Sequence, residues 1–296
     1  MGTSLSGADK DREISDRFSQ LLTAIRASQH PQDVTDRIRD ALDRKSDRPS
    51  DEGTVFIDGS FAVDAVAYES ETTQILQVRQ RDLGDCFAVK TVPVSRRDDP
   101  VLVHRLRREA KIGLGLRHPC LQEISALLRL RDGRPGLLQP WVPSTLAALL
   151  KTRQPSLDEI SRVLHRVLRG LSVMHDAGYV HCDVSPSNIM LPENDIMKAR
   201  LGDFGITLQK GKRHADLGIA VAGSPEFSAP EQLAGAPAHA VHDIYAAGRL
   251  AERLLAGHHG EERPALIRFI HACTRNEATT CPQNADDAIN FLESGR

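Results

Sequence analysis

The spacing of hydrophobic residues changes twice along this chain. Between residues 11 and 45 they recur every three or four positions, which predicts two amphipathic helices separated at Pro31. Short β-rich runs follow within 54–95, and two further strand candidates lie at 124–130 and 136–142. Beyond them the helical period returns and predicts helices over 145–152, 157–176, 239–256, 264–274 and 285–293.

One long helix is predicted inside the β-rich region, after the strand candidate 86–92. Leu102, Leu106, Ala110 and Leu114 share one face of this helix, and glycines near its end predict its termination. A β-rich lobe with one helix therefore precedes a larger helical lobe, which predicts an α+β fold. We expect a helical extension with a linker, a first lobe and a second lobe, at residues 1–52, 53–139 and 140–296.

The composition is typical of a folded globular domain. Apolar residues make up 40% and charged residues 26%, and the formal net charge of −2 gives no general attraction to nucleic acid or membranes. No apolar run reaches the roughly 18 residues that span a bilayer, and the polar N-terminus predicts no signal peptide. Five scattered cysteines argue against a disulfide framework or a zinc site and predict a reducing, cytoplasmic location.

Two short polar loops carry the residues with the clearest chemistry. Asp183 and Asn188 lie in loop 181–191, Asp203 lies in loop 201–205, and an apolar segment precedes each loop. We expect both loops to be turns at strand ends that project polar side chains into a cleft. Phosphoryl transfer needs metal ligands, a cation on the phosphates and an acceptor for the hydroxyl proton, and Mg²⁺ prefers hard oxygen ligands. These residues therefore suit a phosphoryl-transfer site.

The two loops also match known sequence motifs. The first resembles the catalytic loop H-R-D-L-x-x-x-N of protein kinases, and the second is their D-F-G motif. The likeness continues through the strand with Lys90, through Glu109 in the next helix, and through two later segments, 223–231 and 242–248. Six such motifs in family order make the likeness specific. The chain resembles eukaryotic-like (Hanks-type) serine/threonine protein kinases, including bacterial ones, with a divergent Gly-rich loop.

This resemblance implies a bilobal kinase-like fold, with a small antiparallel sheet and one long helix in the first lobe, and it implies ATP with Mg²⁺ or Mn²⁺. Lys90 would contact the α- and β-phosphates while Glu109 holds it in a charge-assisted pair. Asp203 would chelate one metal ion, Asn188 would take the second, and Asp183 would accept the proton of the acceptor hydroxyl. The alternatives are an exposed ion pair for Lys90 and turn-forming hydrogen bonds for the loop residues.

The resemblance also assigns an adenine-binding site, called the base site below, and a residue that braces the catalytic loop. Gln139 would occupy the gatekeeper position between the lobes. The carbonyl of Pro140, which proline retains, and the backbone of Val142 would meet the adenine edge. Simple burial of Trp141 is the other explanation for this segment. Asp243 would brace the catalytic loop, and capping of its own helix is the alternative for this residue.

Three positions depart from the family pattern. The Gly-rich loop falls at residues 68–75, which contain no glycine, or at 59–62 if an insertion follows, so nucleotide affinity is in question. Cys182 replaces an arginine that pairs with a phosphorylated activation loop, so we expect activity that does not depend on phosphorylation of this loop. Ser185 replaces a lysine that contacts the transferred phosphate, which predicts chemistry slower by a factor on the order of 10².

The predicted function is transfer of the γ-phosphoryl group of ATP to serine or threonine of a protein substrate. Ser224 lies where such kinases keep a hydroxyl that contacts the catalytic aspartate. The basic segment 210–214 would favour acidic substrates, or it is a solvated loop. The alternative is a pseudokinase that senses nucleotide or binds a partner. Residues 11–45 would dock a partner or self-associate, or would pack on the next domain, and no nucleic-acid or membrane partner is expected.

Overall fold

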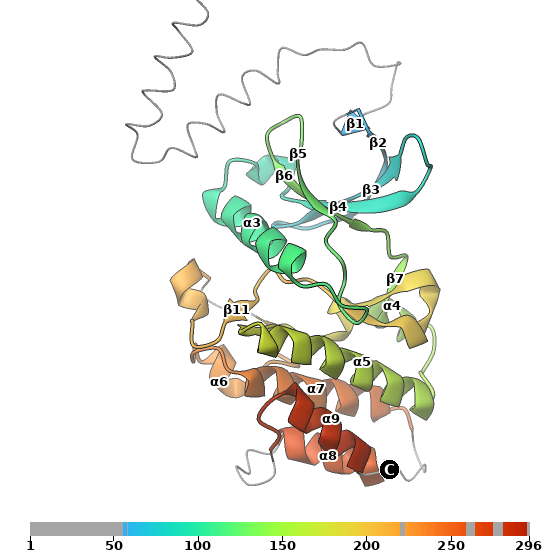
Figure 1. Ribbon diagram of the computed structural model, residues 1–296, viewed down its shortest axis with the longest axis vertical. Coiled ribbons are helices and arrows are strands. Elements are labelled where there is room, and N and C mark those ends of the chain that lie inside the picture. The colour runs from blue at the N-terminus through green and yellow to red at the C-terminus, as the bar shows by residue number, and fades with distance from the viewer. Residues whose placement is uncertain (1–55, 58, 220–222, 259–263, 275–280, 295–296) are drawn as a thin grey trace, which may run out of the picture. The chain divides into compact units, whose positions relative to one another are not determined.

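The computed structural model describes residues 56–57, 59–219, 223–258, 264–274 and 281–294 (Figure 1). Apart from residues 131–133, the described residues belong to one compact unit. The helical extension predicted at residues 1–52 lies outside the described residues and stays a prediction.

Antiparallel strands form the sheet of the first lobe. Their order is β1 (Phe56–Ile57), β2 (Phe61–Glu69), β3 (Gln74–Gln80), β4 (Cys86–Thr91), β6 (Pro135–Pro140) and β5 (Ala126–Arg129). All of these strands except β2 were predicted. The last six residues of β2 are exposed, so this strand lacks the alternation of buried and exposed positions that marks a strand in a sequence.

The long helix of the first lobe is α3 (Pro100–Gly115), which lies against the sheet in Figure 1. Asp99 caps it, because Asp99 Oδ1 accepts the backbone N–H groups of residues 101 and 102 at 3.0 and 3.2 Å. Of the predicted apolar face, Leu114 is exposed, whereas Glu109 and Gly113 are buried. Positions four apart drift by about 40° at each step around an α-helix, so the buried stripe moves from the 110–114 line to Glu109 and Gly113.

Helices dominate the second lobe, as the sequence predicted. They are α4 (Leu146–Leu149), α5 (Leu157–Asp176), α6 (Pro230–Leu233), α7 (Ala240–Leu255), α8 (Pro264–Thr274) and α9 (Ala285–Ser294). Helix α5 begins at a capping box: Ser156 Oγ accepts the Glu159 N–H at 3.3 Å, and Glu159 Oε2 accepts the Ser156 N–H at 2.7 Å. Helix α4 is shorter than predicted, because residues 150–152 form a turn. No helix of the described residues is long and apolar enough to cross a membrane.

Two small sheets hold the polar loops in place. Strand β8 (Tyr179–Val180) pairs with β11 (Leu208–Gln209), and β9 (Ile189–Leu191) pairs with both β10 (Arg200–Leu201) and β7 (Ser144–Thr145). The loop with Asp183 therefore runs from β8 to β9, and the loop with Asp203 runs from β10 to β11. Each loop is tethered by antiparallel pairing at both ends, as expected for turns that position side chains.

Candidate active site

Lys90 on β4 lies between two carboxylates. Its Nζ is 2.8 Å from Oε1 of Glu109 on α3 and 2.9 Å from Oδ1 of Asp203. Burial alone would lower the pKa of Lys90, but the negative charges of Asp203 and Glu109 outweigh it and raise this pKa above its ordinary value. The Lys90 side chain is only 9% exposed, so the exposed ion pair considered as an alternative is excluded.

Asp203 has a left-handed backbone, with φ at 61°. This conformation is uncommon for a residue other than glycine and occurs preferentially at functional sites. Asp203 Oδ1 accepts the Gly205 N–H at 3.1 Å. Burial would raise the pKa of Asp203, but the charge and hydrogen bond of Lys90 lower it to about 2, so the carboxylate is ionised at neutral pH.

Asp183 is held on both sides by predicted site residues. Asn188 Nδ2 donates to the Asp183 backbone carbonyl at 2.8 Å and to Asp183 Oδ2 at 2.7 Å. Ser224 Oγ donates to Asp183 Oδ1 at 2.9 Å, although 41 positions separate the two residues. The structure therefore brings these three residues together. The bonds from Asn188 also shape the loop, so the turn-forming alternative and a role in the site coexist.

Among the residues that the structure describes, two hard oxygens at this site have no hydrogen-bond or ion-pair partner. The amide nitrogen of Asn188 makes both of its hydrogen bonds to Asp183, so Asn188 Oδ1 points away from that residue. Asp203 uses Oδ1 for both Lys90 and Gly205, and within the described ranges no hydrogen bond or ion pair engages its Oδ2. An amide oxygen and an ionised carboxylate oxygen are ligands that Mg²⁺ accepts, so these residues fit the ion that the kinase resemblance implies.

Asp243 on α7 braces the catalytic loop and does not cap its helix. Its Oδ2 accepts the His181 N–H at 2.8 Å and faces His175 Nε2 at 3.0 Å, while its Oδ1 accepts the Cys182 N–H at 2.8 Å. The cap of α7 is His239. Burial would raise the pKa of Asp243, but the hydrogen bond and charge of His175 outweigh it and lower this pKa. The bracing role expected for Asp243 thus matches its contacts.

Two arginines of α3 hold the segment that follows Asp203. Arg105 Nε and Arg108 Nη2 each donate to the Gly205 carbonyl at 3.1 Å, and Arg108 also donates to the Thr207 carbonyl. Neither arginine was predicted as a site residue, although the arginine-rich stretch 105–108 beside Glu109 was the available signal. Cys182, by contrast, is buried, and burial raises the pKa of its thiol, so it packs as a small neutral side chain.

Phe204 anchors the same segment in the core beneath α3. It is 1% exposed, and its ring lies edge-on to the His181 ring with centroids 5.9 Å apart. A Cβ atom placed on Gly113 would lie 2.2 Å from Ile124 Cδ1 and 3.2 Å from Phe204 Cδ2. The absence of a side chain at Gly113 therefore lets α3, Ile124 and Phe204 approach one another.

We expect Gly113→Ala to lower the free energy of unfolding. Alanine gains about 1 kcal/mol of helix propensity over glycine. Overpacking against Ile124 and Phe204 costs about 1–3 kcal/mol, so the steric effect wins. Urea denaturation measures the difference, with Gly115→Ala in the same helix as the control, because nothing lies within 4 Å of a Cβ at Gly115. Equal or higher stability of Gly113→Ala relative to this control would contradict the packing argument.

The predicted base site lies at the end of β6. Gln139 and Pro140 pair with β4, and the Trp141 N–H donates to the Cys86 carbonyl at 3.3 Å, which extends that pairing by one residue. The Pro140 carbonyl accepts Nε2 of Gln122 at 3.2 Å. Gln122 was not predicted as a site residue, and its only signal in the sequence was a polar side chain close to apolar Leu121 and Ile124.

The hairpin between β2 and β3 occupies the preferred position of the Gly-rich loop. The Ser70 N–H donates to the Thr73 carbonyl at 2.8 Å, and Ser70 Oγ accepts the N–H groups of Thr73 at 3.2 Å and Thr72 at 3.4 Å. No residue of this hairpin has a positive φ, so the turn does not require glycine. Gly59 and Ser60 instead form the turn between β1 and β2.

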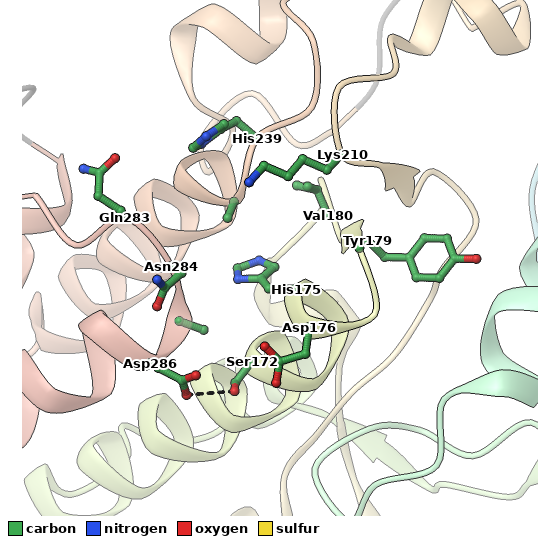
Figure 2. A pocket seen from close by; sticks show the side chains of 13 residues that line it. Ser172, His175, Asp176, Tyr179, Val180, Lys210, His239, Gln283, Asn284 and Asp286 are labelled. Atoms are coloured by element: carbon green, nitrogen blue, oxygen red, sulfur yellow. Dashed lines mark hydrogen bonds between the residues drawn. The ribbon is translucent and has the colours of Figure 1, made fainter.

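A hollow of about 390 Å³ is lined in part by His175, the histidine that contacts Asp243. Figure 2 shows His175 between Lys210 and His239 on one side and Ser172 and Asp286 on the other. His175 is the residue that links this hollow to Asp243. Ser172 Oγ donates to Asp286 Oδ1 at 2.8 Å, which joins α5 to the start of α9.

Comparison with known proteins identifies the class. The protein kinase domain family matches residues 70–284, and the chain belongs to this family. The chain is 30% identical to the serine/threonine-protein kinase pkn3 of Myxococcus xanthus, over 67% of this chain and 38% of that protein. It is 32% identical to the serine/threonine-protein kinase PknK of Mycobacterium bovis, over 64% of this chain and 17% of that protein.

These comparisons confirm the predicted family and its bilobal α+β fold. The chain spans well under half the length of these relatives, because its matches cover 38% and 17% of them. The likeness to both proteins is therefore a likeness of the kinase domain.

Proposed function

We propose that this chain transfers the γ-phosphoryl group of ATP to serine or threonine residues of protein substrates. The observation that carries this proposal is the convergence of three separate segments: β4 with Lys90, the loop after β10 with Asp203, and the loop after β8 with Asp183 and Asn188. A pseudokinase that only binds a partner would not need the ion pairs of Lys90 with Glu109 and Asp203. It would also not need the hydrogen bond from Asn188 to Asp183. The names of the bacterial relatives support serine or threonine as the acceptor.

Each side chain has one task in this proposal. Lys90, held by Glu109, neutralises charge on the α- and β-phosphates. Asp203 Oδ2 and Asn188 Oδ1 supply oxygen ligands for Mg²⁺, which offsets phosphate charge when bound, and Mn²⁺ fits the same ligands. The backbone of Pro140 and Val142 meets the adenine edge, with Gln139 beside it as the gatekeeper.

Asp183 acts on the acceptor hydroxyl. It orients that hydroxyl toward the γ-phosphorus and takes its proton as the new oxygen–phosphorus bond forms and the bond to the β-phosphate oxygen breaks. Phosphorylated substrate and ADP are the products. Ser224, which donates to Asp183 Oδ1, holds the carboxylate in place for this transfer.

The test is direct transfer of label. Purified protein is incubated with γ-labelled ATP, Mg²⁺ or Mn²⁺ and generic protein substrates, beside the Asp183→Ala variant. Label on phosphoserine or phosphothreonine that disappears in the variant supports the enzyme. Absence of transfer from both proteins, with thermal stabilisation by nucleotide, would replace the proposal with a nucleotide-sensing scaffold.

Activity is expected without phosphorylation of the activation segment. Thr207 is the one hydroxyl residue between Gly205 and Gly223, and it is fully buried with its Oγ1 3.4 Å from the His181 carbonyl. Arg105 and Arg108 already hold this segment through backbone carbonyls. Phosphatase treatment and the Thr207→Val substitution should therefore leave the transfer rate unchanged. A marked fall after phosphatase treatment would contradict this expectation.

The hairpin at residues 70–73 points to weak nucleotide binding. Ser70 Oγ occupies the N–H groups of Thr72 and Thr73, which therefore do not face phosphate oxygens. We infer that affinity for ATP comes from Lys90, the metal ligands and the base site. Ser70→Gly should free both N–H groups and tighten ATP binding, as measured by titration calorimetry, and unchanged affinity would contradict this inference.

We also propose a reducing compartment, such as the cytoplasm, as the location of this domain. All five cysteines are free, and three of them are buried. Free buried thiols are typical of proteins kept under reducing conditions. Docking or self-association through residues 11–45 remains part of the proposal for partners besides the protein substrate.

A further inference from the structure

Gln122 connects the two ends of the site. Its backbone N–H donates to the Leu201 carbonyl at 2.8 Å, just before Gly202 and Asp203. Its side-chain amide reaches the carbonyl of Pro140 at the end of β6. A nucleotide with its phosphates at Asp203 and its base at Pro140 would span the same two segments that Gln122 joins.

The surroundings of Gln122 agree with this placement. A Cβ atom added to Gly202 would lie 3.0 Å from Gln122 Cβ and 3.4 Å from Met190 Cγ. Gly202 precedes Asp203, Met190 lies two positions after Asn188, and the Gly202 N–H donates to the Asn188 carbonyl at 2.8 Å. Gln122 is therefore packed against Gly202, which adjoins the proposed metal ligand Asp203 and is bonded to the backbone of the other one, Asn188.

The orientation of the Gln122 amide is fixed by chemistry. The nitrogen and oxygen of a side-chain amide are assigned from their hydrogen-bond partners. The Pro140 carbonyl can only accept a hydrogen bond, so the amide nitrogen is the atom that faces it, and Oε1 is the neighbouring atom of the same amide group. A flip of the amide would bring two acceptor oxygens together.

Oε1 of Gln122 is left as an unsatisfied acceptor. The residue is 3% exposed, and Oε1 is buried without a hydrogen-bond donor among the residues that the structure describes. A buried acceptor without a donor is destabilising, and a ligand that brings a donor removes that cost. The 6-amino group of adenine is such a donor, whereas the 6-oxo group of guanine is an acceptor that Oε1 would repel.

We propose that Gln122 is a specificity residue that selects adenine, by accepting a hydrogen bond from the 6-amino group while the Pro140 carbonyl locks its amide. This proposal rests on the proposed function and extends it to the choice of nucleotide. The Pro140 carbonyl has a second lone pair, so it can also accept from the same amino group. Selection therefore depends on two acceptors, of which Gln122 supplies the one that has no donor in the described part of the chain.

The test removes the contact from the protein and from the ligand separately. Dissociation constants are measured by titration calorimetry for ATP, GTP and purine riboside triphosphate, which lacks a substituent at position 6. Each nucleotide is titrated with Mg²⁺ into the full chain, as wild type and as Gln122→Met, which keeps the length of the side chain and removes the amide. Gln122→Leu is the second variant in case the first does not fold, and thermal melting checks both.

Wild type is expected to prefer ATP over both other nucleotides. In Gln122→Met the preference for ATP over purine riboside triphosphate should fall by about 10-fold, because the variant loses one hydrogen bond to the 6-amino group and such a bond changes affinity by about that factor. A cycle of this kind isolates the contact between Gln122 and the amino group from a change in stability.

The outcomes separate the two proposals. If wild type binds ATP and the substitution leaves both preferences unchanged, Gln122 is only a structural link to Pro140 and the assignment is wrong. If wild type binds none of the three nucleotides, the proposed function fails and this assignment fails with it. A loss of discrimination with an unchanged melting temperature supports the assignment.

Discussion

Replacing Asp183 by asparagine is expected to lower kcat by about 10²- to 10⁴-fold, the usual contribution of a positioned general base. Asparagine cannot take the proton of the acceptor hydroxyl at neutral pH. Its oxygen can still accept from Asn188 Nδ2, and its nitrogen can donate to Ser224 Oγ, because a hydroxyl both donates and accepts. The variant should therefore keep its fold and its affinity for ATP.

Single-turnover label transfer and ATP titration measure these two quantities. Ser224→Ala is the matched control, because it removes a hydrogen bond to Asp183 Oδ1 and leaves the base intact. A hydrogen bond to a charged carboxylate contributes about 1.5–3 kcal/mol, so this control should lose at most about 10- to 100-fold in kcat. An Asp183→Asn variant that is no slower than Ser224→Ala would show that Asp183 is not the base.

Replacing Asp243 by asparagine is expected to destabilise the protein by about 3 kcal/mol. Asp243 is fully buried, and its two oxygens accept from His181, Cys182 and His175. In either orientation the amide nitrogen of asparagine faces a backbone N–H. One buried donor left unpaired costs about 1–3 kcal/mol, and the remaining bonds lose the benefit of the carboxylate charge.

This loss should lower the melting temperature by about 6–12 °C, since 1 kcal/mol corresponds to about 2–4 °C for a domain of this size. Asp99→Asn is the matched control. Asp99 also accepts two backbone N–H groups, but it is only partly buried at the start of α3, where asparagine caps a helix about as well. Equal melting temperatures of the two variants would show that the buried brace contributes nothing to stability.

Local sequence patterns predicted the helical framework closely. The predicted boundaries of α5 and α8 agree with the observed ones, because each helix has a sustained helical period and α5 starts at Ser156 with Glu159 three positions later. The loops with Asp183 and Asp203 were predicted for a similar reason. Their motifs lie within a few residues, so sequence spacing alone defines them.

Contacts between distant residues could not be derived from the sequence. Gln122 and Pro140 are 18 positions apart, and Arg108 and Gly205 are 97 apart. Whether such side chains meet depends on how the sheet, α3 and the catalytic loop pack. Hydrophobic periodicity does not predict the distance between side chains that lie far apart in the sequence. The same holds for Ser70, whose hydroxyl occupies amides that the family resemblance assigned to phosphate binding.

The sequence by itself determined the family, the order of most of the helices and strands, and the residue types available for phosphoryl transfer. Only the tertiary structure decided which polar atoms have no partner among the described residues, namely Oδ1 of Asn188, Oδ2 of Asp203 and Oε1 of Gln122. The physical reason is that a hydrogen bond requires a donor and an acceptor within about 3 Å, and this distance is set by packing rather than by sequence separation.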